Sequence, residues 1–163
     1  MQMSNTVEYA LRAVVWLADH TEKSHTSAEI AEATRMPASY LSKVLKSLSH
    51  EGIVSGQRGV HGGFTLARDP EGLSILEVVN AVEPVQRIRA CPLGFESHGK
   101  NLCNLHRALD DVMIEIERAF ASHTIGEMLT RPNRVKPLCG VLVNGKPPRQ
   151  DLPANTGIRR SHT

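Results

Sequence analysis

The amino-acid sequence predicts a mainly α-helical fold with one small β-hairpin, in which a winged helix-turn-helix domain is followed by a long helix. Two short helical patterns meet close to Pro37, and two short apolar runs around a glycine-rich turn follow them at residues 53–66. An amphipathic pattern of about four turns begins at Leu105. Because 40% of the 163 residues are hydrophobic but only 4% are aromatic, the expected core is mostly aliphatic.

Three helices are expected before the hairpin. The first begins with a polar cap at residue 4 or 5 and ends near residue 20, and the second is capped by residue 26 or 27. The third follows Pro37, a residue suited to the first turn of a helix, and it ends near Gly52. Its inward face consists of Leu41, Val44, Leu45 and Leu48. Two short helices that meet at a tight turn, with the second one longer, are typical of a helix-turn-helix.

A hairpin is expected directly after the third helix. The runs Ile53–Ser55 and Gly63–Leu66 are strand-like and flank a glycine-rich turn at 56–62. A glycine-rich loop can also cradle the phosphates of a nucleotide. That motif lies between a strand and a helix, whereas these glycines lie between two strands. We therefore expect a wing beside the helix-turn-helix.

The rest of the chain divides at Pro84. A fourth helix before it has Ile75, Val78, Val79 and Val82 on its expected buried side. Residues 84–104 have no sustained period, and the amphipathic stretch after them suits a dimer seam, with a place in the core as the alternative. The expected organisation is a winged helix-turn-helix domain at 1–83, a cysteine/histidine sensor loop at 84–104, a dimerisation helix at 105–130 and a basic, disordered tail at 131–163.

The net charge of +2 is unevenly distributed along the chain. Residues 1–83 contain 7 Lys and Arg against 10 Asp and Glu, whereas from residue 130 onward 7 basic residues face a single acidic one. If the first half binds DNA, it does so with locally placed cations. No run of about 18 apolar residues occurs. Glu8 and Arg12 interrupt the first apolar run, so we expect no signal peptide, no membrane association and a cytoplasmic protein.

The outward face of the third helix carries polar side chains that can reach DNA, among them Ser39, Tyr40 and Lys43. An amphipathic helix fits the major groove, although a solvated face of an ordinary helix has the same composition. Arg58 lies at the tip of the hairpin, where the backbone at Gly59 can approach DNA closely and one cation can enter the minor groove. His61 is a weaker candidate beside it.

Four segments together resemble one bacterial family of regulators. They are EYALR at 8–12, AEAT at 31–34, PASYLSKVL at 37–45 and RGVHGGF at 58–64. They look like the Rrf-type (IscR/NsrR-like) winged helix-turn-helix transcription regulators, and the resemblance runs from residue 1 to about 130. It implies a homodimer on double-stranded DNA with a roughly palindromic operator. It also implies that Ser39, Tyr40 and Lys43 face the major groove and that Arg58 faces the minor groove.

Three cysteines in a chain without an expected export signal argue against a disulfide scaffold. Cys91, Cys103 and His106 offer two thiolates and an imidazole, which are ligands that iron–sulfur clusters and zinc select. The CxxH spacing from Cys103 crosses from the loop into the first turn of the long helix. Cys139, in the tail, is expected to be an incidental thiol.

The resemblance implies an iron–sulfur cluster of the 2Fe–2S type, with one departure. Relatives that bind clusters carry three cysteines spaced C-x5-C-x5-C. The outer two match here at 91 and 103, but the middle position is Ser97, a poor cluster ligand. His106 matches a position where one subgroup uses a histidine to complete its cluster. His98 adjoins the position of the missing cysteine and could replace it. Glu8 matches a position from which, in other relatives, an acidic residue of the partner subunit ligates the cluster. The alternatives are another metal such as zinc, or no metal, with thiols that are reduced or joined in a redox-switched disulfide.

The sequence thus predicts a sequence-specific DNA-binding transcription regulator that responds to redox state or to an iron–sulfur cluster. The alternative is a cluster-free regulator or interaction module that senses a metabolite, a thiol state or a partner enzyme. No nucleophile with an adjacent base, no motif of paired carboxylates and no cofactor fingerprint occurs, so no enzyme is expected.

Overall fold

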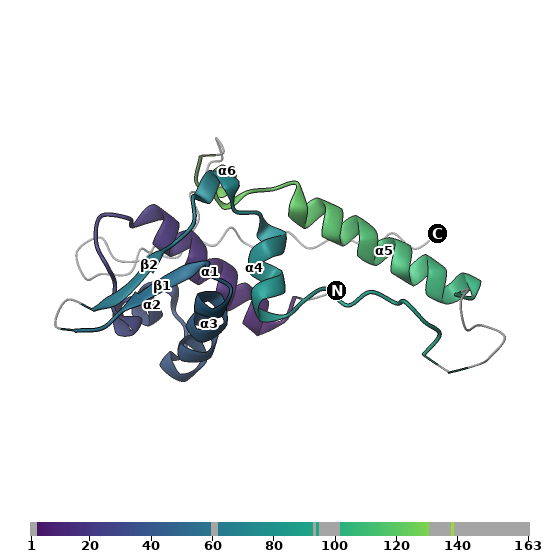
Figure 1. Cartoon of the computed structure of the whole chain (residues 1–163), viewed down its shortest axis with the longest axis horizontal. Helices are drawn as coiled ribbons and strands as arrows, with labels where there is room; N and C mark the ends of the chain where they lie inside the picture. The colour runs from purple at the N-terminus through teal and green to yellow at the C-terminus, as the bar shows by residue number, and fades with distance from the viewer. Residues whose placement is uncertain (1–2, 60–61, 93, 95–101, 131–137, 139–163) are drawn as a thin grey trace, which may run out of the picture.

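The computed structural model describes residues 3–59, 62–92, 94, 102–130 and 138 (Figure 1). The expected fold class is confirmed, because the described chain is mainly helical and contains an antiparallel hairpin. Its elements are α1 (Asn5–Asp19), α2 (Ser27–Thr34), α3 (Ala38–His50), β1 (Val54–Gln57), β2 (Gly63–Leu66), the 3-10 turn η1 (Pro70–Gly72), α4 (Ile75–Val82), α5 (Asn104–Ala121) and α6 (Ile125–Thr130). The expected roles of His61, Ser97, His98, Cys139 and the tail fall outside the described residues.

Local chemistry sets the ends of the first helices. The Thr26 hydroxyl accepts a hydrogen bond from the backbone N–H of Glu29, and the Glu29 carboxylate accepts one from the backbone N–H of Thr26. This capping box begins α2. Arg35 has a φ of 54° and ends α2 in a left-handed turn. Pro37 is the N-cap of α3 and therefore precedes the first turn instead of lying within it. Gly52, with a φ of 68°, lets the chain leave α3.

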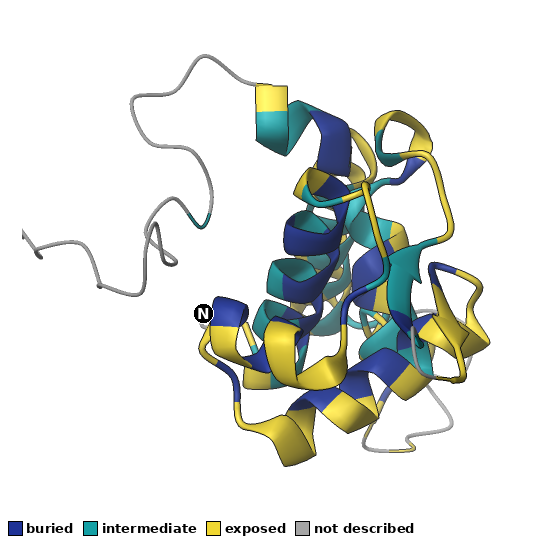
Figure 2. Ribbon diagram, turned by 90° about the vertical axis from the view of Figure 1, so that its left-hand side faces the viewer, coloured by how far each residue is buried: buried dark blue, intermediate teal, exposed yellow. Residues whose placement is uncertain are grey.

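The core is aliphatic, as its composition predicts. The largest fully buried side chains come from α1, α2, α3, α4, α6 and the end of η1, and all but one are Leu, Ile or Val. They are Leu17, Ile30, Leu41, Leu45, Leu48, Leu73, Ile125, Val14, Val44, Val78 and Thr34. Figure 2 shows these buried positions on the inner sides of the packed helices, with exposed residues on the outer sides. The four apolar residues expected on the inward face of α3 are all buried.

The wing is attached to the helices by a short additional pairing. β1 and β2 pair antiparallel, with Val54 opposite Leu66. His25, just before α2, exchanges two backbone hydrogen bonds with Phe64 of β2, at 3.0 and 2.7 Å. A Cβ atom added to Gly63 would lie 2.6 Å from the carbonyl oxygen of His25, so the two backbones are in close contact. The base of the wing is therefore fixed to the start of α2.

Helix α5 lies outside the core and forms an arm that points away from the wing (Figure 1). None of its residues is buried. The chain then returns to the first domain: the N–H of Ile75 donates to the carbonyl of His123, and the N–H of Ile125 donates to the carbonyl of Leu73. The segment 105–130 thus contains most of α5 and all of α6, and its role as the dimerisation helix and the expected domain limits stay predictions. Within the described ranges, no helix has the length and apolar character needed to cross a bilayer.

Candidate DNA-binding surface and cysteine/histidine cluster

The outward face of α3 is open to solvent. Ser39, Tyr40 and Lys43 are all exposed, and Tyr40, a large aromatic residue, is 43% exposed. The outward face of α3 thus presents hydroxyl groups, an aromatic ring and an ammonium group to solvent, side chains that can contact another molecule.

Neighbouring side chains hold Tyr40 in place. Tyr9 of α1 meets it edge to face, with ring centroids 5.7 Å apart and planes at 76°, a geometry that aromatic pairs prefer. The ammonium group of Lys43 lies over the ring of Tyr40, 5.8 Å from its centroid. The sequence pattern did not indicate Tyr9 as a supporting residue, because the contact joins two helices that are separated along the chain.

The tip of the wing is described as far as Gly59 on one side and from Gly62 on the other. Arg58 is exposed directly after β1. Gly59 has a φ of 118°, a conformation that favours glycine, and its carbonyl accepts a hydrogen bond from the N–H of Gly62 at 2.9 Å. A Cβ atom at Gly62 would lie 2.6 Å from the carbonyl oxygen of Gln57. Two glycines are thus required to close the turn that presents Arg58.

Cys91, Cys103 and His106 come together at the start of α5. Cys103 is the N-cap of the helix, and His106 lies in its first turn. The Nδ1 atom of His106 is 3.3 Å from the sulfur of Cys103 and 3.9 Å from the sulfur of Cys91. The thiol of Cys91 is buried, whereas Cys103 is partly exposed. Neither of these two cysteines forms a disulfide.

The distances allow a comparison with metal coordination. Two ligands of one tetrahedral zinc ion, at about 2.3 Å for sulfur and about 2.0 Å for nitrogen, lie roughly 3.5 Å from each other. Both sulfur–nitrogen distances of the Cys91–Cys103–His106 cluster are close to that value. Among the described residues, however, no three His, Cys, Asp or Glu side chains stand in the full arrangement of a formed metal site. The cluster brings candidate ligands together without completing a site.

The two further ligand candidates are Glu8 and His98. Glu8, on α1, forms an ion pair with Arg12 one turn later, at 2.8 Å, and both side chains are partly exposed. His98 lies outside the described residues. Within one chain, the structure therefore brings three of the five candidate ligands together.

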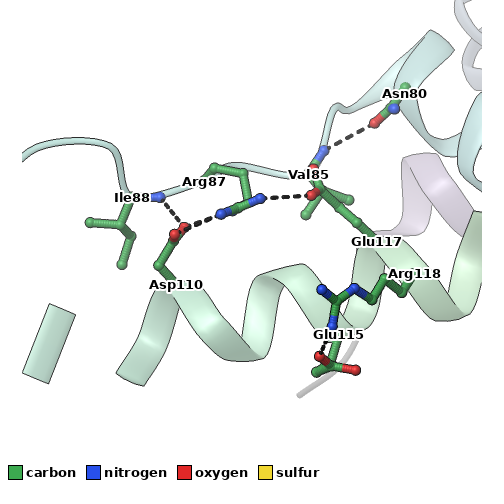
Figure 3. Close-up of polar contacts among 8 residues, drawn as sticks. All are labelled: Asn80, Val85, Arg87, Ile88, Asp110, Glu115, Glu117 and Arg118. Atoms are coloured by element: carbon green, nitrogen blue, oxygen red, sulfur yellow. Dashed lines mark hydrogen bonds and ion pairs between the residues drawn. The ribbon is translucent and has the colours of Figure 1, made fainter. Parts of the chain in front are cut away.

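An ion-pair cluster that sequence reasoning missed joins the segment after α4 to α5 (Figure 3). Arg87 donates two hydrogen bonds to the carboxylate of Asp110, each at 2.7 Å, and one to Glu117 at 3.0 Å. The backbone N–H of Ile88 also donates to Asp110, at 2.9 Å. The hydrogen bonds from Arg87 lower the pKa of Asp110 to about 2, and the same contacts raise the pKa of Arg87. Twenty-three residues separate Arg87 from Asp110, so no local pattern could indicate the pair.

Comparisons with known proteins agree with this architecture. NsrR of Geobacillus kaustophilus (strain HTA426), named an HTH-type transcriptional regulator, is 30% identical over 135 residues, which cover 79% of this chain and 90% of that protein. The solved structure of T. potens IscR superposes with a TM-score of 0.65 at 24% identity, covering 79% of this chain and 86% of that one. CymR, the global cysteine regulator of B. subtilis, superposes with a TM-score of 0.64 at 18% identity, covering 78% and 95%.

The helix-turn-helix, the wing and these relatives define a transcriptional regulator that binds DNA, not an enzyme. The family model described as an iron-dependent transcriptional regulator, Rrf2, matches residues 3–131. The chain belongs to the Rrf2 family.

Proposed function

We propose that this regulator reads a roughly palindromic operator with the outward face of α3 and the tip of its wing. Ser39, Tyr40 and Lys43 enter the major groove, and Arg58 enters the minor groove with the backbone at Gly59 close to the DNA. The observation that carries the proposal is the exposed ring of Tyr40, held edge-on by Tyr9 with a lysine over its face. His61, in the same turn of the sequence, is an additional candidate contact.

Gel shifts at several salt concentrations test this surface, using a duplex selected from a random pool by the wild-type protein. Arg58→Ala should weaken binding to all sequences and lower the salt slope by about one, whereas Tyr40→Ala should change which duplexes are preferred. Arg118→Ala is the matched control, because Arg118 is an exposed arginine on the arm. If Arg58→Ala and Tyr40→Ala both bind like the control, the proposed reading surface is wrong.

We propose that α5 is the seam of a homodimer. Leu105, Leu109 and Val112 repeat at helical spacing and are 65%, 44% and 52% exposed. Such a stripe is costly in water and fits a second copy of the same helix. Leu109→Glu should convert the dimer to a monomer in sedimentation experiments, and Asp111→Asn, an exposed change on the same helix, should leave it dimeric. A dimeric Leu109→Glu variant would contradict the proposed seam.

We propose that the side chains of Cys91, Cys103 and His106 bind a 2Fe–2S iron–sulfur group. Thiolates and imidazole are ligands of such clusters, and both sulfurs lie within 3.9 Å of one imidazole nitrogen. A fourth ligand would come from His98, or from Glu8 of a second subunit. When bound, the cluster supplies a reversible one-electron change, and its mixed nitrogen and sulfur ligands raise its reduction potential. Because Cys103 is the N-cap of α5 and His106 lies in its first turn, a change in ligation would act directly on the proposed dimer helix.

Anaerobic purification tests the cluster. The wild-type protein should be coloured and contain iron and sulfide in equal amounts, Cys103→Ala should be colourless, and Cys139→Ala should keep the colour. Ser97→Cys, which restores the spacing of the cluster-binding relatives, should strengthen binding. Colourless wild-type protein that binds its operator tightly without iron would remove the proposal.

A cluster-free sensor is the second candidate. Two observations support this alternative. The described residues do not form a complete metal site, and CymR, one of the structural neighbours, is named a cysteine regulator. In this form, the Cys91 and Cys103 thiols, or a metabolite or partner enzyme bound elsewhere, would carry the signal. Colourless protein whose affinity for the operator changes between thiol reductant and mild oxidant would support it.

A further inference from the structure

The chain between α4 and the Cys91–Cys103–His106 cluster runs alongside α5, and two of its attachments bear on the position of Cys91. We call residues 83–91 the strap. Its first attachment is a hydrogen bond from the backbone N–H of Val85 to the side chain of Asn80, at 3.3 Å. Its second is the ion pair between Arg87 and Asp110, which the N–H of Ile88 reinforces. The strap ends at Cys91.

The second attachment is the stronger one. The guanidinium of Arg87 binds the carboxylate of Asp110 through two parallel hydrogen bonds, a geometry that lysine cannot reproduce. The side chains are only 19% and 15% exposed, whereas the pair between Arg118 and Glu115 on the same helix is about 70% exposed (Figure 3). Partial shielding from water makes the pair of Arg87 and Asp110 the more effective contact.

The attachment lies close to the ligands. Asp110 follows His106 by four residues, so the two share one face of α5 about one turn, or roughly 5.4 Å, apart. Cys91 is the third residue after Ile88, and a step of three residues spans at most about 10 Å. A chain fixed only at the end of α4, nine residues before Cys91, would reach about 30 Å, and one fixed only at Val85 would reach about 20 Å.

We propose that Arg87 and Asp110 are positioning residues that hold Cys91 at His106 and thereby set how tightly the Cys91–Cys103–His106 cluster binds a metal. This inference rests on the metal-binding function proposed above. The chain that is fixed at Ile88 has a reach two to three times shorter than a chain fixed only at Val85 or at the end of α4. Because the accessible volume follows the cube of the reach, the Cys91 thiol is confined to a volume about ten- to thirtyfold smaller. Residues that orient metal ligands commonly change metal affinity by about 10- to 100-fold, which is the same range.

Cobalt(II) is the probe for the first experiment, with the full-length, reduced protein under anaerobic conditions. Asp110→Asn places an amide N–H against the guanidinium of Arg87, and Arg87→Met removes the charge at similar length. Each should weaken cobalt binding about ten- to thirtyfold and reduce the sulfur-to-cobalt absorption to about half, because one of two thiolates is lost. Glu115→Gln, which breaks the exposed pair with Arg118, is the matched control and should bind like the wild type.

The double variant, Arg87→Met with Asp110→Asn, shows whether the two residues act on cobalt affinity through their shared ion pair or independently. Each single variant leaves one further contact, from Arg87 to Glu117 or from the Ile88 N–H to Asp110, but both remove the shared pair. The loss of cobalt affinity in the double variant should therefore be smaller than the sum of the two single losses. Effects that simply add would overturn the inference, because they would show that the two residues act independently.

The second experiment needs no metal. In chelator-treated protein, alkylation of each cysteine is followed by mass spectrometry. The buried thiol of Cys91 should react at least about tenfold faster in Asp110→Asn than in the wild type or in Glu115→Gln, while the rate at Cys103 stays unchanged. If Cys91 is alkylated faster in Asp110→Asn than in the wild type, but the wild-type protein binds no cobalt, the metal-binding function is refuted and the positioning role stands. Unchanged alkylation and unchanged cobalt affinity in Asp110→Asn would refute the positioning role alone.

Discussion

Gly63→Ala tests how the wing is held to the helices. The added methyl group would lie 2.6 Å from the carbonyl oxygen of His25 and 2.8 and 2.9 Å from the carbon and nitrogen of the same backbone. These atoms cannot rotate away as the end of a flexible side chain can. β2 must therefore move away from His25, which breaks the paired hydrogen bonds between His25 and Phe64.

The expected loss follows from these contacts. Forcing a methyl group into a filled site costs about 1–3 kcal/mol, and each of the two backbone hydrogen bonds contributes about 0.5–1.5 kcal/mol net. The free energy of unfolding should therefore fall by about 2–6 kcal/mol. Because the wing presents Arg58, operator binding should weaken as well.

Urea unfolding followed by tryptophan fluorescence measures this loss directly. Trp16 is the only tryptophan in the sequence, and its ring lies 4.6 Å from that of His25. Protein concentrations must be equal, since dimer formation would contribute to stability. Gly72→Ala is the control: nothing lies within 4 Å of its added Cβ atom, so stability should be unchanged or rise by up to about 1 kcal/mol. A Gly63→Ala variant within about 0.5 kcal/mol of the wild type would refute the reasoning.

Three further changes test other parts of the structure. Tyr9→Ala should weaken operator binding about two- to tenfold in gel shifts, because an edge-to-face pair contributes about 0.5–1.5 kcal/mol to holding Tyr40, whereas Tyr9→Phe should bind normally. Thr26→Ala removes the capping box of α2 and should lower the free energy of urea unfolding by about 0.5–2 kcal/mol; an unchanged midpoint would contradict the role of the cap. The pKa of Asp110 is lowered to about 2, so its ion pair stabilises the fold above about pH 4 and is lost as the pH falls through 2. The stability of Asp110→Asn, measured by thermal unfolding, should therefore fall less steeply than that of the wild type between pH 4 and 2.

The helical framework could be predicted from the sequence because its determinants are local. The expected end of the first helix near residue 20 agrees with α1 ending at Asp19, and the expected cap at 26 or 27 agrees with Thr26. The hairpin was predicted from two short apolar runs around glycines, and β2 has the expected bounds. Capping and apolar periodicity act over a few residues, so a single sequence reveals them.

Contacts between distant segments could not be predicted in the same way. The pairing of His25 with Phe64 joins an isolated residue to a strand, and the ion pair of Arg87 and Asp110 joins a loop to a helix. Neither contact leaves a periodic pattern, because its partners come together only once the helices have packed. The three candidate ligands Cys91, Cys103 and His106 were predicted from their chemistry and from the family resemblance, and the structure adds that the two sulfur atoms lie within 3.9 Å of His106 Nδ1.

Because the chain returns to the core at Ile125, the position at which this regulator is truncated affects the stability of the core. The other buried members of the core that contains Ile125 all lie at or before Val78, so the DNA-binding unit is built from two separate stretches of sequence. A truncation after residue 83 would leave a hole at the site of Ile125 and cost about 2–5 kcal/mol, as large-to-small changes in cores do. The arm is an insertion: the chain departs at one end of α4 and rejoins beside the other, about 12 Å away along an eight-residue helix. Replacing residues 84–122 with a linker that spans this distance would keep every buried side chain of the core that contains Ile125, so we expect the DNA-binding unit to fold without the arm.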